Sequence, residues 1–157
     1  MSASSLPTAA ELPELPVRSR AEILARVESI VERACRRQLW FLFFDAGDCQ
    51  LPALVPMDIP ARPEPAGPGA STEREVAAIA SLLDEITDTT DAAWLVLVYE
   101  RPGAAALRPE DSAWFAFLAE VADRTEMPVR AAVAVCGRRF RCIHAGEGLG
   151  PAAELAG

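Results

Sequence analysis

The sequence has no lysine and only one histidine, His144. All fifteen basic residues are therefore arginine, a bias that, together with abundant alanine, is typical of a GC-rich genome rather than of a functional choice. Catalytic zinc sites usually take three protein ligands, mostly His, Asp, Glu or Cys. With a single histidine, every zinc site that needs two of them is excluded.

The chain also lacks long apolar runs and paired cysteines. No stretch approaches the roughly 20 apolar residues of a membrane-spanning helix, and the N-terminus lacks the basic start and apolar segment of a secretory signal. The four cysteines (Cys35, Cys49, Cys136 and Cys142) form no C-x-x-C pair. We therefore expect a cytoplasmic protein with reduced thiols.

Length and net charge further limit the class of protein. A chain of 157 residues is long enough to bury the core of one domain. Its net charge of −8 is unfavourable for binding nucleic acids or an anionic membrane surface. We expect no membrane partner, and the charge does not favour a nucleic acid as partner.

Apolar periodicity and turn residues divide the chain into three parts. We predict a flexible N-terminal arm (1–18), a single α/β domain (19–143) with a Pro-rich loop (58–70), and a flexible tail (144–157). Capping boxes beginning at Ser19 and Thr72 mark two helix starts. The expected elements are a helix at 19–38, strands at 39–46 and 51–57, a helix at 71–87, a strand at 93–99, a helix from Pro109 to before Met127, and strands at 129–136 and 139–143.

This order predicts a single layer of mixed sheet flanked by helices, an α/β architecture. Two prolines in the second strand predict that it lies at an edge or is irregular. Strand 129–136 alternates so that Val129, Ala131, Val133 and Val135 are expected on one face.

The strand at 93–99 is the expected centre of the sheet, because its unbroken apolar run is typical of a strand buried on both faces. In open α/β sheets the carboxyl end of such a strand is the usual place for a site. The polar residues that follow it are candidates for ligand or partner contact: Tyr99, Glu100, Arg101, Arg108 and Asp111.

Within this group we expect Arg101 and Asp111 to pair. Arg101 would lie just past the strand, and Asp111 in the first turn of a helix that returns beside it. For a partly exposed pair we expect about 0–1 kcal/mol of stability. Arg101→Ala should then leave folding nearly intact.

A basic edge patch is a second candidate, made of Arg138, Arg139 and Arg141. It could bind a phosphate or an acidic partner, and nucleic-acid binding through these arginines is a third interpretation of the function. The alternative is the charged, solvated edge strand that protects a sheet from aggregation. Cys136, Cys142 and His144 are the only potential metal ligands close in sequence. We interpret the cysteines as small buried or half-buried thiols, and predict no metal, no cofactor and no catalytic residue.

The strand that ends in Pro102-Gly103 and leads into an acidic helix start, within this order of elements, resembles the JAB/MPN (JAMM) metalloprotease-like fold, particularly its bacterial RadC-like branch. That family carries H-x-H-P-x-G after the central strand and S-x-x-D at the next helix. With a one-residue deletion in the loop, Tyr99 and Arg101 fall on the two histidines and Arg108 on the serine. Asp111 falls on the aspartate and is the one functional residue retained.

The resemblance spans about residues 20–143 in order of elements, and the first hairpin offers no glutamate that stands out as the family's general acid/base. It implies a metal-free relative that cannot perform the family's hydrolysis; an ordinary α/β domain is the alternative. We therefore expect a non-catalytic domain that acts through protein–protein contacts or self-association, with the loops at 58–70 and 101–108 as contact surfaces. The rival is an enzyme or small-ligand binder that uses the polar groups after strand 93–99.

Overall fold

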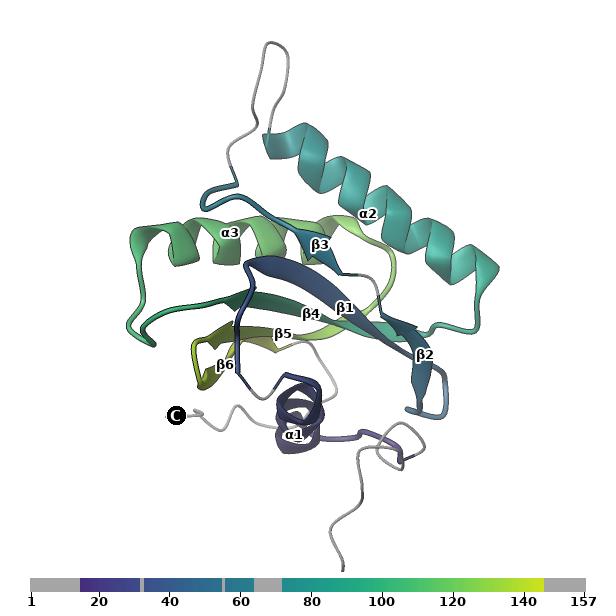
Figure 1. The fold of residues 1–157 in the computed structure, drawn as a ribbon. Coiled ribbons are helices and arrows are strands. Elements are labelled where there is room, and N and C mark those ends of the chain that lie inside the picture. The colour runs from purple at the N-terminus through teal and green to yellow at the C-terminus, as the bar shows by residue number, and fades with distance from the viewer. Residues whose placement is uncertain (1–14, 32, 55, 64–71, 146–157) are drawn as a thin grey trace, which may run out of the picture.

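The computed structural model describes residues 15–31, 33–54, 56–63 and 72–145. It has one central sheet with helices on both faces (Figure 1). Helix α1 (Arg20–Ile30) covers one face, and helices α2 (Thr72–Thr89) and α3 (Pro109–Arg124) cover the other. The predicted mixed sheet between helices is confirmed.

The strands run in the order β2-β1-β4-β5-β6, and a short β3 also pairs with β1. Only β4 and β5 are parallel, and α3 makes the crossover between them. The other pairings are antiparallel. The bounds are β1 Gln38–Phe44, β2 Gln50–Leu54, β3 Met57–Asp58, β4 Trp94–Arg101, β5 Val129–Cys136 and β6 Arg139–Ala145.

The predicted strand at 51–57 is at the edge of the sheet, as expected, but it is divided into β2 and β3. Pro56 lies between the two pieces. It has no N–H to donate to a ladder, which favours the interruption.

Helix α1 is shorter than predicted, ending at Ile30 rather than at residue 38. Ser19 caps its start by accepting from the Glu22 N–H at 3.1 Å. Beyond the helix the chain is extended at Val31, and the Ala34 N–H donates to the Gly137 carbonyl at 2.9 Å. Val31 and Ala34 continue the helical spacing of apolar residues but pack on the sheet outside the helix.

Helix α2 begins without the predicted capping box at Thr72. Thr72 is itself the first helical residue, and its hydroxyl donates to the Pro63 carbonyl at 3.2 Å. At the other end the helix continues past residue 87 to Thr89. Asp84, near that end, accepts from Thr125 Oγ1 at 2.7 Å and so ties α2 to the end of α3.

Two of the predicted boundaries fall inside the folded domain. Val17, assigned from sequence to the flexible arm, is buried and donates its N–H to the Asp48 carbonyl at 2.8 Å. Strand β6 continues through Ala145, two residues into the predicted tail. The rest of the tail, the first fourteen residues and most of the Pro-rich loop lie outside the described residues.

Two hydrophobic cores lie on opposite faces of the sheet. We call them the helix-pair core, under α2 and α3, and the α1 core. Successive residues of β4 alternate between them, and all eight are buried, which confirms the prediction of a strand covered on both faces. In the helix-pair core β4 places Leu95, Leu97 and Tyr99, and in the α1 core Trp94, Val96 and Val98.

Strand β5 departs from its predicted alternation at one position. Ala131, Val133 and Val135 lie in the α1 core, but Val129 packs against the helix-pair core. The pairing with β4 shifts register between Leu95 and Val96, so Val129 and Ala131 face neighbouring partners. An inserted residue of this kind reverses the side on which the preceding side chains lie.

Among the described residues, no helix is both long and apolar enough to cross a membrane.

Candidate functional site

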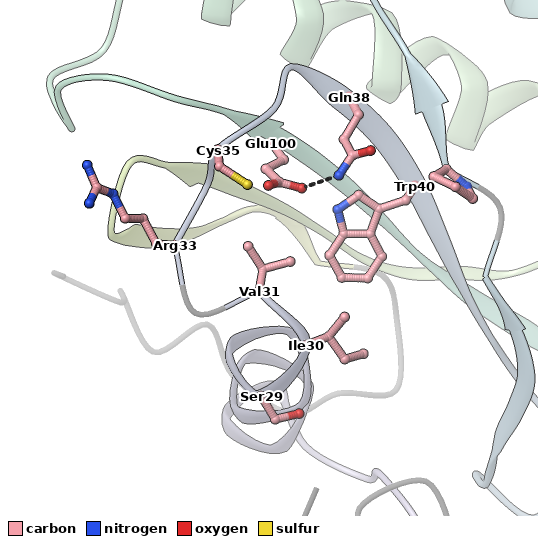
Figure 2. A pocket seen from close by; sticks show the side chains of 9 residues that line it. Ser29, Ile30, Val31, Arg33, Cys35, Gln38, Trp40 and Glu100 are labelled. Carbon is pink, nitrogen blue, oxygen red and sulfur yellow. Dashed lines mark hydrogen bonds between the residues drawn. The ribbon is translucent and has the colours of Figure 1, made fainter.

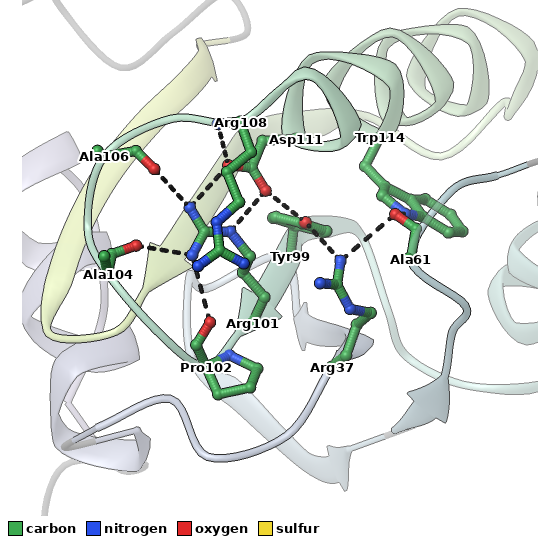
Figure 3. A network of polar contacts seen from close by, with 10 residues as sticks. All are labelled: Arg37, Ala61, Tyr99, Arg101, Pro102, Ala104, Ala106, Arg108, Asp111 and Trp114. Carbon is green, nitrogen blue, oxygen red and sulfur yellow. Dashed lines mark hydrogen bonds and ion pairs between the residues drawn. The ribbon is translucent and has the colours of Figure 1, made fainter.

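The end of β4 distributes its polar residues over both faces of the sheet. Tyr99 and Arg101 point to the side of α3, where they meet Asp111 (Figure 3). Glu100 points to the side of α1, next to Gln38 (Figure 2). The five candidate residues therefore do not form one site. Strand alternation is the cause, since neighbouring side chains lie on opposite faces.

Arg101 and Asp111 form the predicted pair, in a two-pronged geometry. Arg101 Nε lies 2.6 Å from Asp111 Oδ1, and Arg101 Nη2 lies 2.8 Å from Asp111 Oδ2. Both side chains are fully buried, with 0% exposure. The expectation of a partly exposed, weak pair is thus wrong. Arg101 is also the last residue of β4, whereas the prediction ended the strand at Tyr99 and placed Arg101 just past it.

The remaining N–H groups of Arg101 hold the loop that follows. Nη1 donates to the carbonyls of Pro102 at 3.2 Å and Ala104 at 2.7 Å. Nη2 donates to the carbonyl of Ala106 at 2.8 Å in addition to its bond with Asp111. A guanidinium has five N–H donors, and here every one of them has an acceptor.

Asp111 is equally occupied. Oδ1 also accepts from the Tyr99 hydroxyl at 2.7 Å, and Oδ2 from the Arg108 N–H at 2.8 Å. The last bond caps α3, because Arg108 is the residue just before the helix and its N–H has no partner in the first turn. A carboxylate offers about four acceptor sites, so no acceptor site remains for a ligand.

Arg108 joins the site mainly through its backbone. Its half-buried guanidinium lies over Gly103, where a Cβ would come within 2.8 Å of Arg108 Nη2. Gly103 has a φ of +99°, a conformation that glycine adopts without strain. The Pro-Gly turn identified in the sequence therefore serves to bring the loop under this arginine.

Tyr99 extends the network toward the Pro-rich loop (Figure 3). Arg37 Nη1 donates to the Tyr99 hydroxyl at 3.4 Å and to the Ala61 carbonyl at 3.3 Å. Trp114 Nε1 donates to the same carbonyl at 3.1 Å. No sequence pattern indicated a role for Arg37 here, because the pair Arg36-Arg37 resembles the charged end of a helix.

The pKa values of the buried groups follow from these contacts. Burial alone would raise the pKa of Asp111, but hydrogen bonds from Arg101, Tyr99 and the Arg108 N–H outweigh it and hold this pKa below its usual value. The hydrogen bond to Asp111 raises the pKa of Arg101. Burial, followed by the bond to Asp111, raises the pKa of Tyr99. All three groups thus keep their ordinary charge at neutral pH.

The metal that the JAB/MPN resemblance implies does not fit these residues. At the two histidine positions stand a phenol and a guanidinium, and the carboxylate already accepts four hydrogen bonds. A cation would have to displace the Arg101 charge from a buried ion pair, which costs several kcal/mol by typical values. We therefore assign no metal chemistry to this corner.

The other predicted ligand group is also divided by the sheet. Cys136 belongs to the helix-pair core, whereas Cys142 packs against the α1 core. Across the part of the chain that the structure describes, no group of three or more His, Cys, Asp or Glu side chains is arranged to hold a metal ion. Burial raises the pKa of the Cys136 thiol, which makes it a poor nucleophile.

The basic edge patch lies on β6, at an edge of the sheet. Arg139 pairs with Cys136 and Arg141 with Ala134, so both arginines lie on the α3 side of the sheet. Arg138 is exposed at the turn before them. Strand alternation leaves two of the three arginines on one face; the binding of an anion there stays a prediction.

A second feature of this strand end was not predicted. Trp40 and Gln38 of β1 lie beside Glu100 on the α1 side, and together they line a cavity (Figure 2). In the sequence Trp40 opens an aromatic run that is typical of a core strand. Nothing in that run distinguishes Trp40 from its neighbours.

No known family model matches the chain, and no curated protein sequence matches it.

Proposed function

We propose that this protein is a non-catalytic α/β domain that acts through protein–protein contacts, and that the loop at 102–108 is its contact surface. One observation carries the proposal: a buried arginine holds this loop from inside by three of its carbonyl groups. The polar groups that a reaction at the end of β4 would need are the same groups that hold the loop.

The bonds from Arg101 fix the loop backbone and leave its side chains outside. Pro102, Ala104 and Ala106 are exposed, and Leu107 is 52% exposed, the largest exposure among the large apolar residues of the described chain. A rigid loop with an apolar tip loses little conformational entropy on binding, which favours its use as a contact. Side chains of this kind suit an apolar patch on a protein rather than a polar ligand.

The same arrangement supports the proposed relationship to JAB/MPN domains in a metal-free form. Tyr99, Arg101 and Asp111, which fall on the family's ligand positions, converge at one point beside α3. In such a relative, the positive charge of Arg101 would take the place of the family's metal ion, and the corner would support a loop where the metal-binding proteins carry out hydrolysis.

Site-specific photo-crosslinking in cells tests the proposal. A benzophenone amino acid is placed at Leu107 and, as a matched control, at Leu82, an exposed leucine on α2. We expect a discrete adduct from position 107 and none from position 82. An adduct of twice the chain's mass would identify self-association, and a larger or smaller one a different protein. Equal, diffuse labelling from both positions would overturn the proposal.

A further inference from the structure

A cavity of about 640 Å³ opens on the α1 side of the sheet, on the opposite face from the Arg101–Asp111 pair (Figure 2). Its walls are largely apolar, with Ile30 and Val31 at the end of α1, and Pro56 beyond β2. The polar lining comes from Gln38 and Trp40 on β1 and Glu100 on β4, and also from Ser29 on α1 and from Arg33 and Cys35 in the segment that follows it. Figure 2 shows the Arg33 guanidinium turned away from Glu100. Drug-sized ligands occupy cavities of about 300–1,000 Å³, so there is room for two or three residues of peptide.

Glu100 is a carboxylate in an unusual setting. Only 2% of the residue is exposed, and the carboxylate accepts from Gln38 Nε2 at 2.7 Å. Among the described residues it has no arginine within ion-pair distance, whereas the buried Asp111 has one at 2.6 Å. A buried carboxylate is unfavourable unless it is paired. One neutral donor leaves most of its acceptor capacity unused.

Trp40 supplies the complementary group. It is 4% exposed, and within the described part of the chain its indole N–H has no hydrogen-bond partner. The two other tryptophans are satisfied, since Trp94 donates to Asp48 at 3.0 Å and Trp114 to Ala61 at 3.1 Å. Figure 2 shows the indole nitrogen of Trp40 on the side of the ring that faces Glu100.

The sheet register fixes these groups as neighbours. Gln38 lies directly opposite Glu100, and Trp40 lies opposite Val98. Trp40 and Glu100 are therefore diagonal neighbours on one face, within reach of a single small group. A ligand that satisfies both must carry a donor for the carboxylate and, a short distance away, an acceptor for the indole N–H.

We propose that this cavity binds an α-amino carbonyl group, in which a primary ammonium is separated by one carbon from a carbonyl. The ammonium donates to Glu100 and supplies the missing positive charge. The carbonyl accepts from Trp40 Nε1, and an apolar substituent on the intervening carbon packs against Ile30, Val31 and Pro56. The N-terminus of a peptide and a free amino-acid amide share this chemistry. The proposal is independent of the loop at 102–108, since none of the residues that line the cavity belongs to that loop.

Titration of ¹⁵N-labelled protein, followed by NMR, tests the proposal directly. The probes are L-leucine amide and the tripeptide amide Leu-Ala-Ala-NH₂, each with a free and with an acetylated amine. The three indole N–H resonances are assigned by tryptophan-to-phenylalanine variants. We expect the free amines to move the Trp40 indole resonance while those of Trp94 and Trp114 stay in place.

Acetylation and Glu100→Gln should each weaken binding by about tenfold or more, as expected for the loss of a charge-assisted hydrogen bond. Glu120→Gln, an exposed acidic position on α3, is the matched control and should change nothing. Tighter binding of the tripeptide would identify a peptide N-terminus as the source, and equal binding a free amino-acid derivative. An unmoved Trp40 resonance, or equal binding of the acetylated probes, would overturn the proposal even if Glu100→Gln failed to fold.

Discussion

Arg101 places a full positive charge inside the protein and surrounds it with oxygen atoms. Its removal would leave Asp111 buried and unpaired and would release three loop carbonyls. Breaking a buried pair from one side typically costs about 3–5 kcal/mol. We therefore expect Arg101→Ala to lower the free energy of unfolding by about that amount, in contrast to the small effect that the sequence suggested.

Chemical denaturation measures this loss, and the chain offers a matched control. Arg124 makes an ion pair of similar length with Glu73, at 2.8 Å, but the two side chains are 43% and 76% exposed. Arg124→Ala should cost about 0–1 kcal/mol. Equal effects of the two variants would show that burial does not determine the strength of the Arg101 pair.

Asp111 makes the stability depend on acid pH. Because its pKa is lower in the folded chain than in the unfolded one, its contribution is complete above the unfolded pKa of about 4. It is lost as the pH falls through the lower, folded pKa. Tyr99→Phe removes one hydrogen bond to the carboxylate, which should raise the folded pKa and reduce this contribution.

Urea midpoints recorded from about pH 5 to about pH 2 test this dependence. The wild type should be the more stable protein at pH 5, and its advantage over Tyr99→Phe should shrink as the pH falls. An advantage that stays constant across this range would mean that the Tyr99 hydroxyl does not act on the ionisation of Asp111.

The turn between β5 and β6 joins three elements through one glycine. The Gly137 N–H donates to the Arg101 carbonyl at 3.0 Å, and its own carbonyl accepts from the Ala34 N–H at 2.9 Å. It has a φ of +63°, and a Cβ there would collide with the Gly103 carbonyl oxygen. The β5–β6 turn thus fixes both the loop after β4 and the segment that follows α1.

We expect Gly137→Ala to lower the thermal midpoint by an amount that corresponds to about 1–3 kcal/mol, from backbone strain and displacement of the loop. Gly47→Ala is the matched control, because that glycine is at an exposed turn with no positive φ, and a Cβ would meet only the Asp45 side chain, at 3.3 Å. A Gly137→Ala protein with the midpoint of the control would mean that the loop can move aside at no cost.

Periodicity predicted the existence and type of the elements because apolar spacing differs between helices and strands. It could not place the end of α1, because Val31 and Ala34 keep helical spacing although both lie beyond the end of the helix and pack on the sheet. It could not place Val129 either, since a register shift leaves no mark in an alternating pattern. Both errors arise where tertiary packing determines the local conformation.

The candidate site, too, could be predicted from the sequence only in part. The crossover from β4 through α3 to the parallel strand β5 brings Asp111 back to Arg101, so their pairing followed from topology. Their complete burial did not, because it depends on the path of the loop at 102–108. No sequence pattern could indicate that the N–H of Trp40 lacks a partner among the described residues, because an aromatic residue in a strand usually belongs to the hydrophobic core.

For the molecule as a whole, the sheet lies between the two cores and contributes side chains to both. Each residue of β4 from Trp94 to Tyr99 belongs to one core, and its neighbours belong to the other. The strand cannot leave its place without opening both cores, so neither core can unfold alone. This is the condition for two-state unfolding of a small domain.

Two single-tryptophan variants should therefore unfold together. Trp114 alone reports on the helix-pair core and Trp94 alone on the α1 core, with the other two tryptophans replaced by phenylalanine. In each variant we expect the fluorescence transition in denaturant to coincide, in midpoint and slope, with the transition of the same variant followed by circular dichroism, because the shared strand makes loss of the two cores one event. The dichroism curve of each variant also serves as its control for any change in stability caused by the substitutions. If the Trp94 signal changed at a lower denaturant concentration than the dichroism, α1 would be detaching first, and the shared strand would not couple the cores.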